Sequence, residues 1–179
     1  MDEKIPTFTS NTVAQLEQQL QAKQFEINSL LEVTQSINSN LSSEKLFKIY
    51  EFTLRGQLGV EKAVVFFKDD DWKCVCNYGT KKTFLDFDVE KNLVGIDKTN
   101  SEILKEFELF IPVLHKEKPL AFVLLSGVKI DSEKSKAERI KFIQTITNII
   151  VVAVENKRLF KRQLEQEAMK KEMELAAQM

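Results

Sequence analysis

Glycine and proline are confined to one part of this 179-residue chain, and their positions decide where helices can run. Of the five glycines and three prolines, all except Pro6 lie between positions 56 and 127. Glycine weakens a helix through the backbone entropy that it loses, and proline through a missing hydrogen-bond donor and a steric clash. Because residues 7–55 and 128–179 contain neither type, both flanks can be helical throughout, and the turns must fall in the middle.

The first flank carries a heptad repeat. Positions from Val13 to Leu41, taken in alternating steps of three and four, are apolar at seven of nine places, and the residues around them are mostly polar. A narrow apolar stripe of this kind forms the seam of a coiled coil. The alternative is an amphipathic helix on the core of its own domain, although such a helix usually has a wider apolar face. We expect a parallel homodimer, whose seam consists of Leu16, Leu20, Ile27, Leu30 and Ile37.

A second helix is predicted to follow Leu41. Ser42 or Ser43 can cap its first turn, because a serine hydroxyl accepts a hydrogen bond from a free backbone N–H. Gly56 and Gly59 are expected to end it. Its apolar stripe is wide, as is typical of a helix that packs on a sheet, and consists of Leu46, Phe47, Tyr50, Leu54 and Leu58.

Four β-rich runs follow and predict two hairpins, at residues 63–67, 72–78, 109–114 and 120–125. The acidic turn Asp69–Asp71 joins the first two runs, and residues 115–119 join the last two. The sequence between the hairpins, residues 80–106, is less regular. Thr99 and Glu102 in it form a capping box for a short helix.

The last flank contains a run, Ile149–Val154, whose residue types favour a strand. No turn signal separates this run from the residues before or after it, so we interpret it as part of a helix that is buried on several sides. With Asp131 as its N-cap, the helix would be about 70 Å long at 1.5 Å per residue. Its far end must therefore leave the domain, and Phe160 and Leu164 are further candidates for the dimer interface.

The composition limits the partners of the chain. A formal net charge of −1 provides no basic surface for nucleic acid or for an anionic membrane. No apolar run approaches the roughly 18 to 20 residues that span a bilayer, and the first ten residues lack the apolar core of a signal peptide. Two cysteines do not form a disulfide framework. We therefore expect a cytoplasmic protein that binds neither nucleic acid nor membrane.

The order helix, helix, hairpin, irregular segment, hairpin and long exit helix resembles a GAF domain, the ligand-sensing relative of the PAS fold, over roughly Leu30–Arg162. Val152–Phe160 is similar to the Ala-x-Ala-x-Glu-Asn-Ala-x-Leu-like run at the end of the family's final helix. The chain departs from the family pattern at Glu117, which lies near the place of a turn glycine, and at Ala121, where a second glycine is usual. The most specific parts of the resemblance are FIPVLHKEKPLAFVLLSG and FIQTITNIIVVAVENKRLFKR.

The resemblance implies an α/β (α+β) fold, in which helices pack on an antiparallel GAF/PAS-like sheet and long coiled-coil-type helices flank it. We expect an N-terminal coiled-coil helix over 1–41, a GAF-like domain over 42–160 and a linker helix over 161–179. Residues 164–179 are also similar to the linker that enters bacterial serine/threonine phosphatases of the stage II sporulation E type, and similar linkers precede histidine kinases and cyclases. An effector domain is therefore expected to follow in the same chain.

The sequence offers little for catalysis, and we expect neither a catalytic residue nor a metal site or cofactor. His115 is the single histidine and lies in a lysine-rich turn. The acidic turn is expected to be solvated, and a cation site at best. Cys74 and Cys76 are expected on one strand face with Trp72 and Tyr78. Together with His115 they would supply at most three soft ligands, one fewer than a closed zinc site needs.

In the family, the ligand lies between the sheet and the irregular segment, here residues 80–106. The resemblance therefore implies a pocket, whose candidate lining residues are Phe66, Cys76, Tyr78, Phe84 and Phe87. We expect a sensor and transducer that binds a small molecule and relays a signal through its exit helix. A dimerisation spacer without a ligand is the alternative, and a cysteine-based redox enzyme is the least favoured function.

Overall fold

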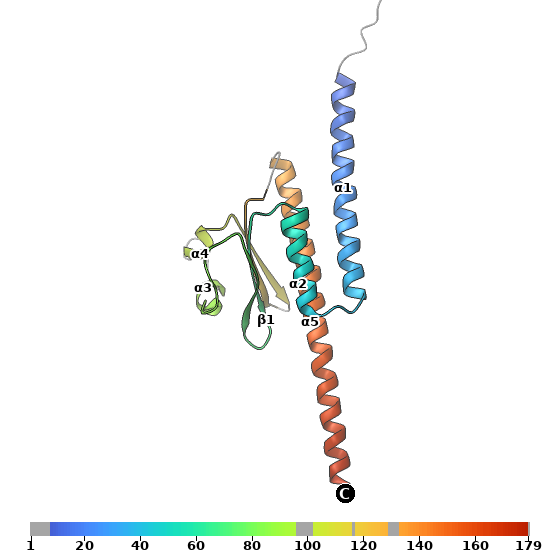
Figure 1. Ribbon diagram of the computed structural model, residues 1–179, viewed down its shortest axis with the longest axis vertical. Coiled ribbons are helices and arrows are strands. Elements are labelled where there is room, and N and C mark those ends of the chain that lie inside the picture. The colour runs from blue at the N-terminus through green and yellow to red at the C-terminus, as the bar shows by residue number, and fades with distance from the viewer. Residues whose placement is uncertain (1–7, 96–101, 116, 129–132, 179) are drawn as a thin grey trace, which may run out of the picture.

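The computed structural model describes residues 8–95, 102–115, 117–128 and 133–178. The helices and the two hairpins follow one another in the predicted order, with one antiparallel sheet between two layers of helices, so the α+β fold is confirmed (Figure 1). The elements are α1 (Phe8–Asn38), α2 (Ser43–Phe52), a π-helical turn η1 (Thr53–Gln57), β1 (Lys62–Lys68), β2 (Trp72–Tyr78), α3 (Val89–Leu93), α4 (Glu102–Lys105), β3 (Leu109–His115), β4 (Lys118–Ser126) and α5 (Glu133–Ala177).

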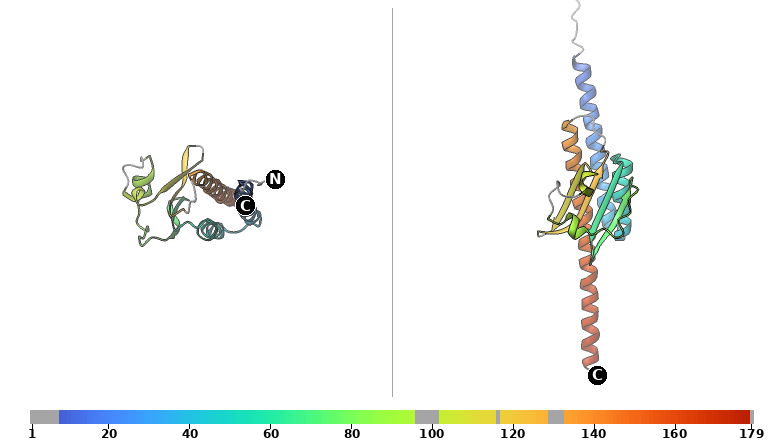
Figure 2. Two further views of the ribbon diagram at one scale, coloured as in Figure 1. Left: turned by 90° about the horizontal axis from the view of Figure 1, so that it is seen from above. Right: turned by 90° about the vertical axis from the view of Figure 1, so that its left-hand side faces the viewer.

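The sheet has the strand order β2-β1-β4-β3, and every neighbouring pair is antiparallel. The two predicted hairpins therefore supply its two halves, and they join through β1 and β4 in the middle. Helices α2 and α5 lie on one face, with α1 behind them, and the short helices α3 and α4 lie on the other (Figure 2). The sheet therefore separates α1, α2 and α5 from α3 and α4.

Alternation along the strands divides the apolar residues into two clusters, because successive side chains point to opposite faces. Ala63, Val65 and Phe67 of β1 belong to the helix-side core, which α1, α2 and α5 complete. Val64 and Phe66 of β1 belong to the outer cluster under α3 and α4. The outer cluster consists of Val64, Phe66, Phe84, Val89, Leu93, Ile103, Leu104, Phe107, Phe122 and Leu124, with Trp72, Phe87, Val94 and Phe110 packed against them.

Helix α2 begins and ends as local chemistry requires. The Ser42 side chain accepts a hydrogen bond from Lys45 N at 3.3 Å, which confirms the predicted N-cap. The five apolar residues of its stripe are buried, as predicted for a helix that packs on a sheet. The helix continues into η1 before the chain leaves at Gly59, which has a φ of +64°. Two other predicted caps, Thr99 and Asp131, lie outside the described residues.

Helix α5 runs without a break through Ile149–Val154, so the helical interpretation of this run is confirmed. Ile143, Ile146 and Ile150 are fully buried in the helix-side core. The second half of α5 leaves the domain at one end, and α1 projects past it at the other (Figure 1). In the described part of the chain, none of the helices has both the length and the apolar character to cross a membrane.

Candidate functional site

A β-bulge in the first hairpin decides which side chains face the outer cluster. Val65 of β1 lies opposite Cys76 of β2, whereas the next residue of β1, Phe66, lies opposite Cys74. Val75 is therefore an extra residue, which shifts the alternation of β2 by one place. Because residues opposite each other in an antiparallel pair share a face, β2 changes faces at this point.

The bulge shows that one sequence prediction is wrong. Regular alternation would put Trp72, Cys74, Cys76 and Tyr78 on one face of the sheet, but the structure divides them. Trp72 packs against the outer cluster, whereas Cys76 and Tyr78 are buried in the helix-side core. Cys74, opposite Phe66, is exposed.

Three of the five candidate pocket residues come together between the sheet and residues 80–95 and 102–107, which we call the cover. The Phe66 ring stacks on Phe87 with centroids 5.2 Å apart, and Phe84 meets both rings edge-on at 5.7 Å. Phe84 is buried and Phe87 is half-buried. The other two candidates, Cys76 and Tyr78, lie on the opposite side of the sheet.

A second row of aromatic rings extends the outer cluster across the sheet. The Phe122 ring of β4 lies between Trp72 of β2 and Phe110 of β3, at centroid distances of 5.1 and 5.5 Å. Sequence reasoning missed these three residues as part of the site. Alternation along β3 and β4 could have placed Phe110 and Phe122 on one face of the sheet. The face of Trp72 could not be predicted, because the bulge in β2 is not visible in the sequence. Phe66, Phe84 and Phe122 are buried, so the two aromatic groups form a closed apolar interior between the sheet and the cover.

The rim of the outer cluster carries a charged contact that ties the cover to β1 and β2. Trp72 Nε1 donates a hydrogen bond to Glu90 Oε1 of α3 at 2.8 Å, and Lys68 Nζ donates to the same oxygen. The Lys68 ammonium also lies over the Trp72 ring, 5.3 Å from its centroid. The bonds from Lys68 and Trp72 lower the pKa of the Glu90 carboxyl. Asp88 caps α3 by accepting from Lys91 N at 3.0 Å.

Asp70 and Asp71 of the acidic turn are exposed, as expected of a solvated turn, and basic side chains also bind the turn. Arg158 Nη1 of α5 donates to the carbonyl oxygen of Asp69 at 3.2 Å and lies 3.5 Å from its Oδ1. Arg162, one helical turn further on, pairs with Asp70. Lys73 Nζ donates to Asp69 Oδ2 at 2.9 Å, and this bond is the main reason why the pKa of the Asp69 carboxyl is lowered. Among the described residues, no group of acidic, histidine or cysteine side chains is arranged to hold a metal ion.

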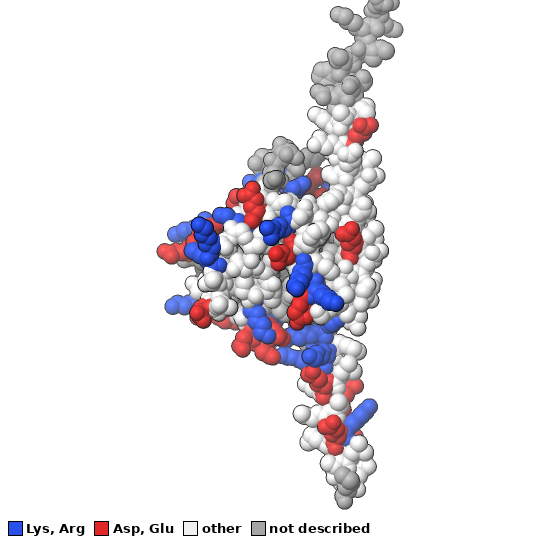
Figure 3. All heavy atoms as spheres, viewed as in Figure 1, with Lys and Arg blue, Asp and Glu red and all other residues white. Residues whose placement is uncertain are grey.

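Helix α5 is anchored at the point where it leaves the domain, to the β1–β2 turn through Arg158 and to the loop after α1 through Lys157. The buried Glu155 accepts two bonds from Arg158, from Nε and Nη2, each of 2.8 Å. Lys157 Nζ donates to the carbonyl oxygens of Asn40 and Leu41 at 3.0 and 2.6 Å, after the end of α1. Charged side chains of both signs gather here, whereas the visible surface of α1 is largely uncharged (Figure 3).

The two cysteines lie in different environments. Burial raises the pKa of the Cys76 thiol to about 12, so this thiol stays protonated at neutral pH. A thiolate is the reactive form of cysteine, and the setting of Cys76 therefore disfavours a redox reaction. Cys74 Sγ donates to the Cys76 carbonyl oxygen at 3.5 Å. His115 lies exposed at the end of β3.

The predicted dimer residues fall into two groups. Leu16, Leu20 and Ile27 of α1 are between 57 and 59% exposed. Leu30 and Ile37 are half-buried instead, because they pack on the helix-side core together with the buried Val33. In the second half of α1, the apolar stripe therefore packs on the core of its own domain. On α5, the predicted residues Phe160 and Leu164 are exposed.

Neither a family model nor a curated protein matches this sequence. Among solved structures, the GAF domain of a protein assigned as a sensor histidine kinase from Pseudomonas syringae pv. tomato is similar, with a TM-score of 0.62 and 14% identity over 84% of this chain and 99% of that one. The GAF domain from an Acinetobacter phosphoenolpyruvate-protein phosphotransferase has a TM-score of 0.50 and 14% identity, over 73% of this chain and 92% of that one. The chain therefore has the GAF fold, with a long helix at each end.

Proposed function

We propose that the chain is a regulatory, non-catalytic sensor module, in which a small molecule binds between the sheet and the cover and changes the position of α5. One observation carries this proposal: the outer face of the sheet has an apolar cluster of its own, which two very short helices close. Helix α3 has five residues and α4 has four. Helices of this length are not stable alone and depend on buried side chains such as Leu93 and Leu104, so the cover can open as a unit separate from the sheet.

The aromatic lining favours a ligand with a flat apolar part. Phe66, Phe84 and Phe122 offer ring faces and edges to such a molecule. Lys68 and Glu90 form an ion pair at the rim of the outer cluster, where they would contact a polar substituent of the ligand. The name of the Pseudomonas protein, a sensor histidine kinase, supports a sensory role for a chain of the same fold.

The output would pass along α5. Ile143, Ile146 and Ile150 fix its first half in the helix-side core, and its second half leads away from the domain. We propose that an effector follows it in the same chain, and that this effector is a bacterial, cytoplasmic serine/threonine phosphatase of the stage II sporulation E type. The similarity of residues 164–179 to the linkers of these phosphatases supports this choice.

The module would act as a homodimer. A helix that projects from its domain gains no stability from packing unless it has a partner. Leu16, Leu20 and Ile27 on α1 and Phe160 and Leu164 on α5 are apolar and exposed, as a paired helix requires. Two copies side by side would deliver two effectors in register.

A ligandless dimerisation spacer is a second candidate. Phe66, Phe84 and Phe87 contact one another directly, and rings in mutual contact can fill the space under the cover by themselves. In that case the outer cluster would be a second core, and its only role would be to support the sheet.

Thermal-shift screening with small aromatic and aliphatic metabolites separates the two candidates. A compound that binds only the folded chain stabilises it by about 2.7 kcal/mol at a hundredfold excess over its dissociation constant. Phe84→Trp should abolish the shift by filling the space under the cover. The neighbouring Leu85 is 92% exposed, so Leu85→Trp is the matched control and should keep the shift.

The sensor function would be refuted if no compound raised the melting temperature and the cover resisted hydrogen exchange as strongly as the sheet. A shift that Phe84→Trp left unchanged would place the ligand elsewhere, and this would contradict the proposed site.

A further inference from the structure

The turn between β1 and β2 lies between the cover and α5 and contacts both. On the cover side, Lys68 and Trp72 are the last pair of opposite residues before the turn, and both reach Glu90 of α3. Trp72 is the only tryptophan of the chain. The position of α3 is therefore tied to the base of this turn.

On the other side, two residues of the turn bind α5. Asp69 accepts from Arg158, and Asp70 pairs with Arg162. The two arginines are four residues apart, so they share one face of the helix. Lys161, beside Arg162, points elsewhere and pairs with Glu165 at 3.8 Å.

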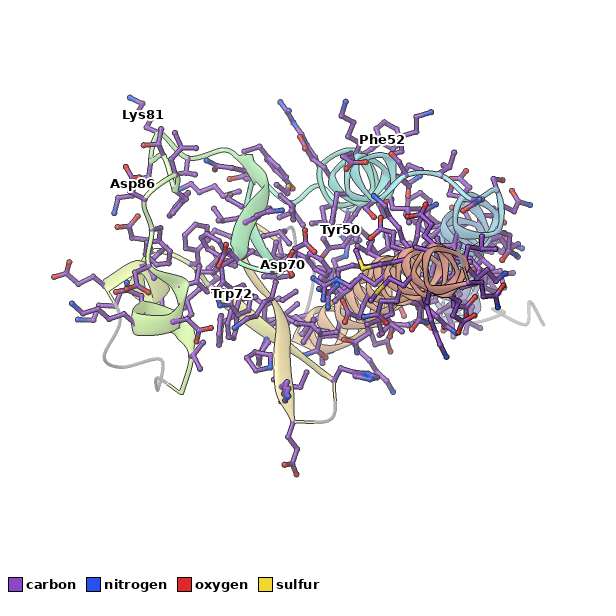
Figure 4. All side chains as sticks on the ribbon, turned by 90° about the horizontal axis from the view of Figure 1, so that it is seen from below. Tyr50, Phe52, Asp70, Trp72, Lys81 and Asp86 are labelled. Atoms are coloured by element: carbon purple, nitrogen blue, oxygen red, sulfur yellow. The ribbon has the colours of Figure 1, made fainter. Side chains whose placement is uncertain are left out.

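These contacts lie where α5 leaves the domain. Val154 and Glu155 are the last buried residues of the helix, and Arg158 follows within one turn. In the view along α5, Asp70 lies between Trp72 and the helix (Figure 4). The turn is short and is closed by a hydrogen bond from Asp69 N to the Asp71 carbonyl at 3.2 Å. Because this bond closes the turn, we expect a displacement at Trp72 to move Asp70 as well.

We propose that the β1–β2 turn couples the cover to the exit half of α5. With Glu90 bound to Lys68 and Trp72, the turn holds Asp69 and Asp70 against Arg158 and Arg162. When α3 moves away, the turn relaxes and α5 loses its contacts with the turn, whereas the bonds of Lys157 to Asn40 and Leu41 remain. The inference rests on the proposed function only for the cause of that movement, namely a ligand under the cover.

The chemistry of the contacts suits a switch. The ion pair of Asp70 with Arg162 is exposed, and pairs of this kind stabilise a fold only slightly, so breaking it changes the position of α5 without unfolding the domain. The buried pair of Glu155 with Arg158 is different, because it is desolvated and stays formed when the turn moves. Arg158 therefore remains in place as the fixed partner, and Asp69 is the part that moves.

The test needs no ligand. Glu90→Ala removes the acceptor on α3, and Lys91→Ala, at the next position of the same helix, is the control that keeps it. Hydrogen exchange of the amides of residues 156–164 reports the release of α5. We expect exchange about fivefold faster or more in Glu90→Ala, the lower end of typical coupling between sites, and no change in the control.

The reverse direction is tested from α5, because coupling between two sites is reciprocal. Arg162→Gln should increase the quenching of Trp72 fluorescence by acrylamide, whereas Lys161→Gln should leave it unchanged. Trp72→Phe repeats the first test from β2, since it keeps one aromatic ring against Phe122 and loses the indole N–H together with the second ring.

Equal exchange of residues 156–164 in Glu90→Ala, Trp72→Phe and the control would overturn the coupling. A response of α5 to Arg162→Gln without any change at Trp72 would overturn it as well. Neither result would contradict ligand binding in the thermal-shift screen. Conversely, a screen without a hit would not contradict the coupling. The two proposals can therefore be refuted separately.

Discussion

The hydroxyl groups of Tyr50 and Thr147 lie 2.5 Å apart in the helix-side core and join α2 to α5. Thr147 Oγ1 also lies 2.7 Å from the Ile143 carbonyl, to which it donates. Because a hydroxyl has one hydrogen to donate, Tyr50 is the donor toward Thr147. Burial raises the pKa of the Tyr50 hydroxyl, so it keeps this proton.

The direction of this bond predicts unequal effects for two substitutions. Thr147→Val keeps the shape of the side chain but leaves the Tyr50 O–H without an acceptor, and a buried unsatisfied donor costs about 1–3 kcal/mol. Tyr50→Phe removes the donor itself and should cost only about 1 kcal/mol. Urea unfolding of both variants measures the difference. A larger loss in Tyr50→Phe would mean that the donor has been assigned wrongly.

Glu117 is predicted to be a site where glycine stabilises the fold. It has a φ of +67°, in the left-handed region where a side chain costs about 1–2 kcal/mol. Glycine removes this strain but adds entropy to the unfolded chain, so Glu117→Gly should raise the free energy of unfolding by up to about 1 kcal/mol. Glu117→Ala keeps Cβ and should bring no gain. Equal stabilities for the two variants, measured by chemical denaturation, would count against strain at this turn.

The Asp69 carboxyl is predicted to contribute to the acid sensitivity of the fold. Its pKa is lowered by Lys73 and, to a smaller degree, by Arg158. With a folded-state pKa below the unfolded value of about 3.9, the stabilisation is complete above that pH and is lost as the pH falls through the folded-state pKa. The side chain is partly exposed, so the contribution is under about 1 kcal/mol.

Asp69→Asn should therefore lower the free energy of unfolding at pH 7 and have less effect near pH 2. Asp71→Asn removes a charge from the same turn but leaves the contacts of Asp69 with Lys73 and Arg158 in place, so it is the control. A loss of stability in Asp69→Asn that is the same at both pH values would show that the ion pairs of this carboxyl do not stabilise the fold.

The strands and helices were predictable because their signals are local. The positions of glycine and proline bounded the two flanks, and Ser42 capped α2 as serine does before an apolar stripe. Ile149–Val154 was correctly predicted to be helical, because no turn residues flank it. A strand at this place would have needed a turn on each side. The element order then sufficed for the resemblance to a GAF domain.

The candidate site was only partly predictable, because its decisive features are not local. The extra residue Val75 has no signature in the sequence, yet it moves Cys76 to the other face of the sheet. The contact of Asp70 with Arg162 joins residues far apart in the chain, and the sequence alone cannot show which of many charges meet.

The stripe of α1 illustrates a third limit. One heptad pattern covers Leu16 and Ile37, but the first is exposed and the second packs on the domain. A stripe of apolar residues shows that a helix buries that face, but it does not identify the partner.

The exposed half of this stripe is predicted to hold the homodimer together. In Leu16→Glu/Leu20→Glu, four like charges would meet at the seam of a parallel pair, and both the apolar contact and the register would be lost. We expect light scattering to give the dimer mass for the unaltered chain and the monomer mass for the variant. Because both leucines are exposed in a single chain, the variant should lose only the stabilisation that comes from association, and the two melting temperatures should converge at low protein concentration.

Gln18→Glu/Gln21→Glu places the same charges on exposed positions outside the heptad seam and should remain dimeric. If Leu16→Glu/Leu20→Glu also remained dimeric, the interface would lie on α5 around Phe160 and Leu164, and the seam assigned to α1 would be wrong. A monomeric mass for the unaltered chain at all concentrations would contradict the dimer itself. Signal transfer would then have to occur within one chain, through the ion pairs that hold α5 to the β1–β2 turn.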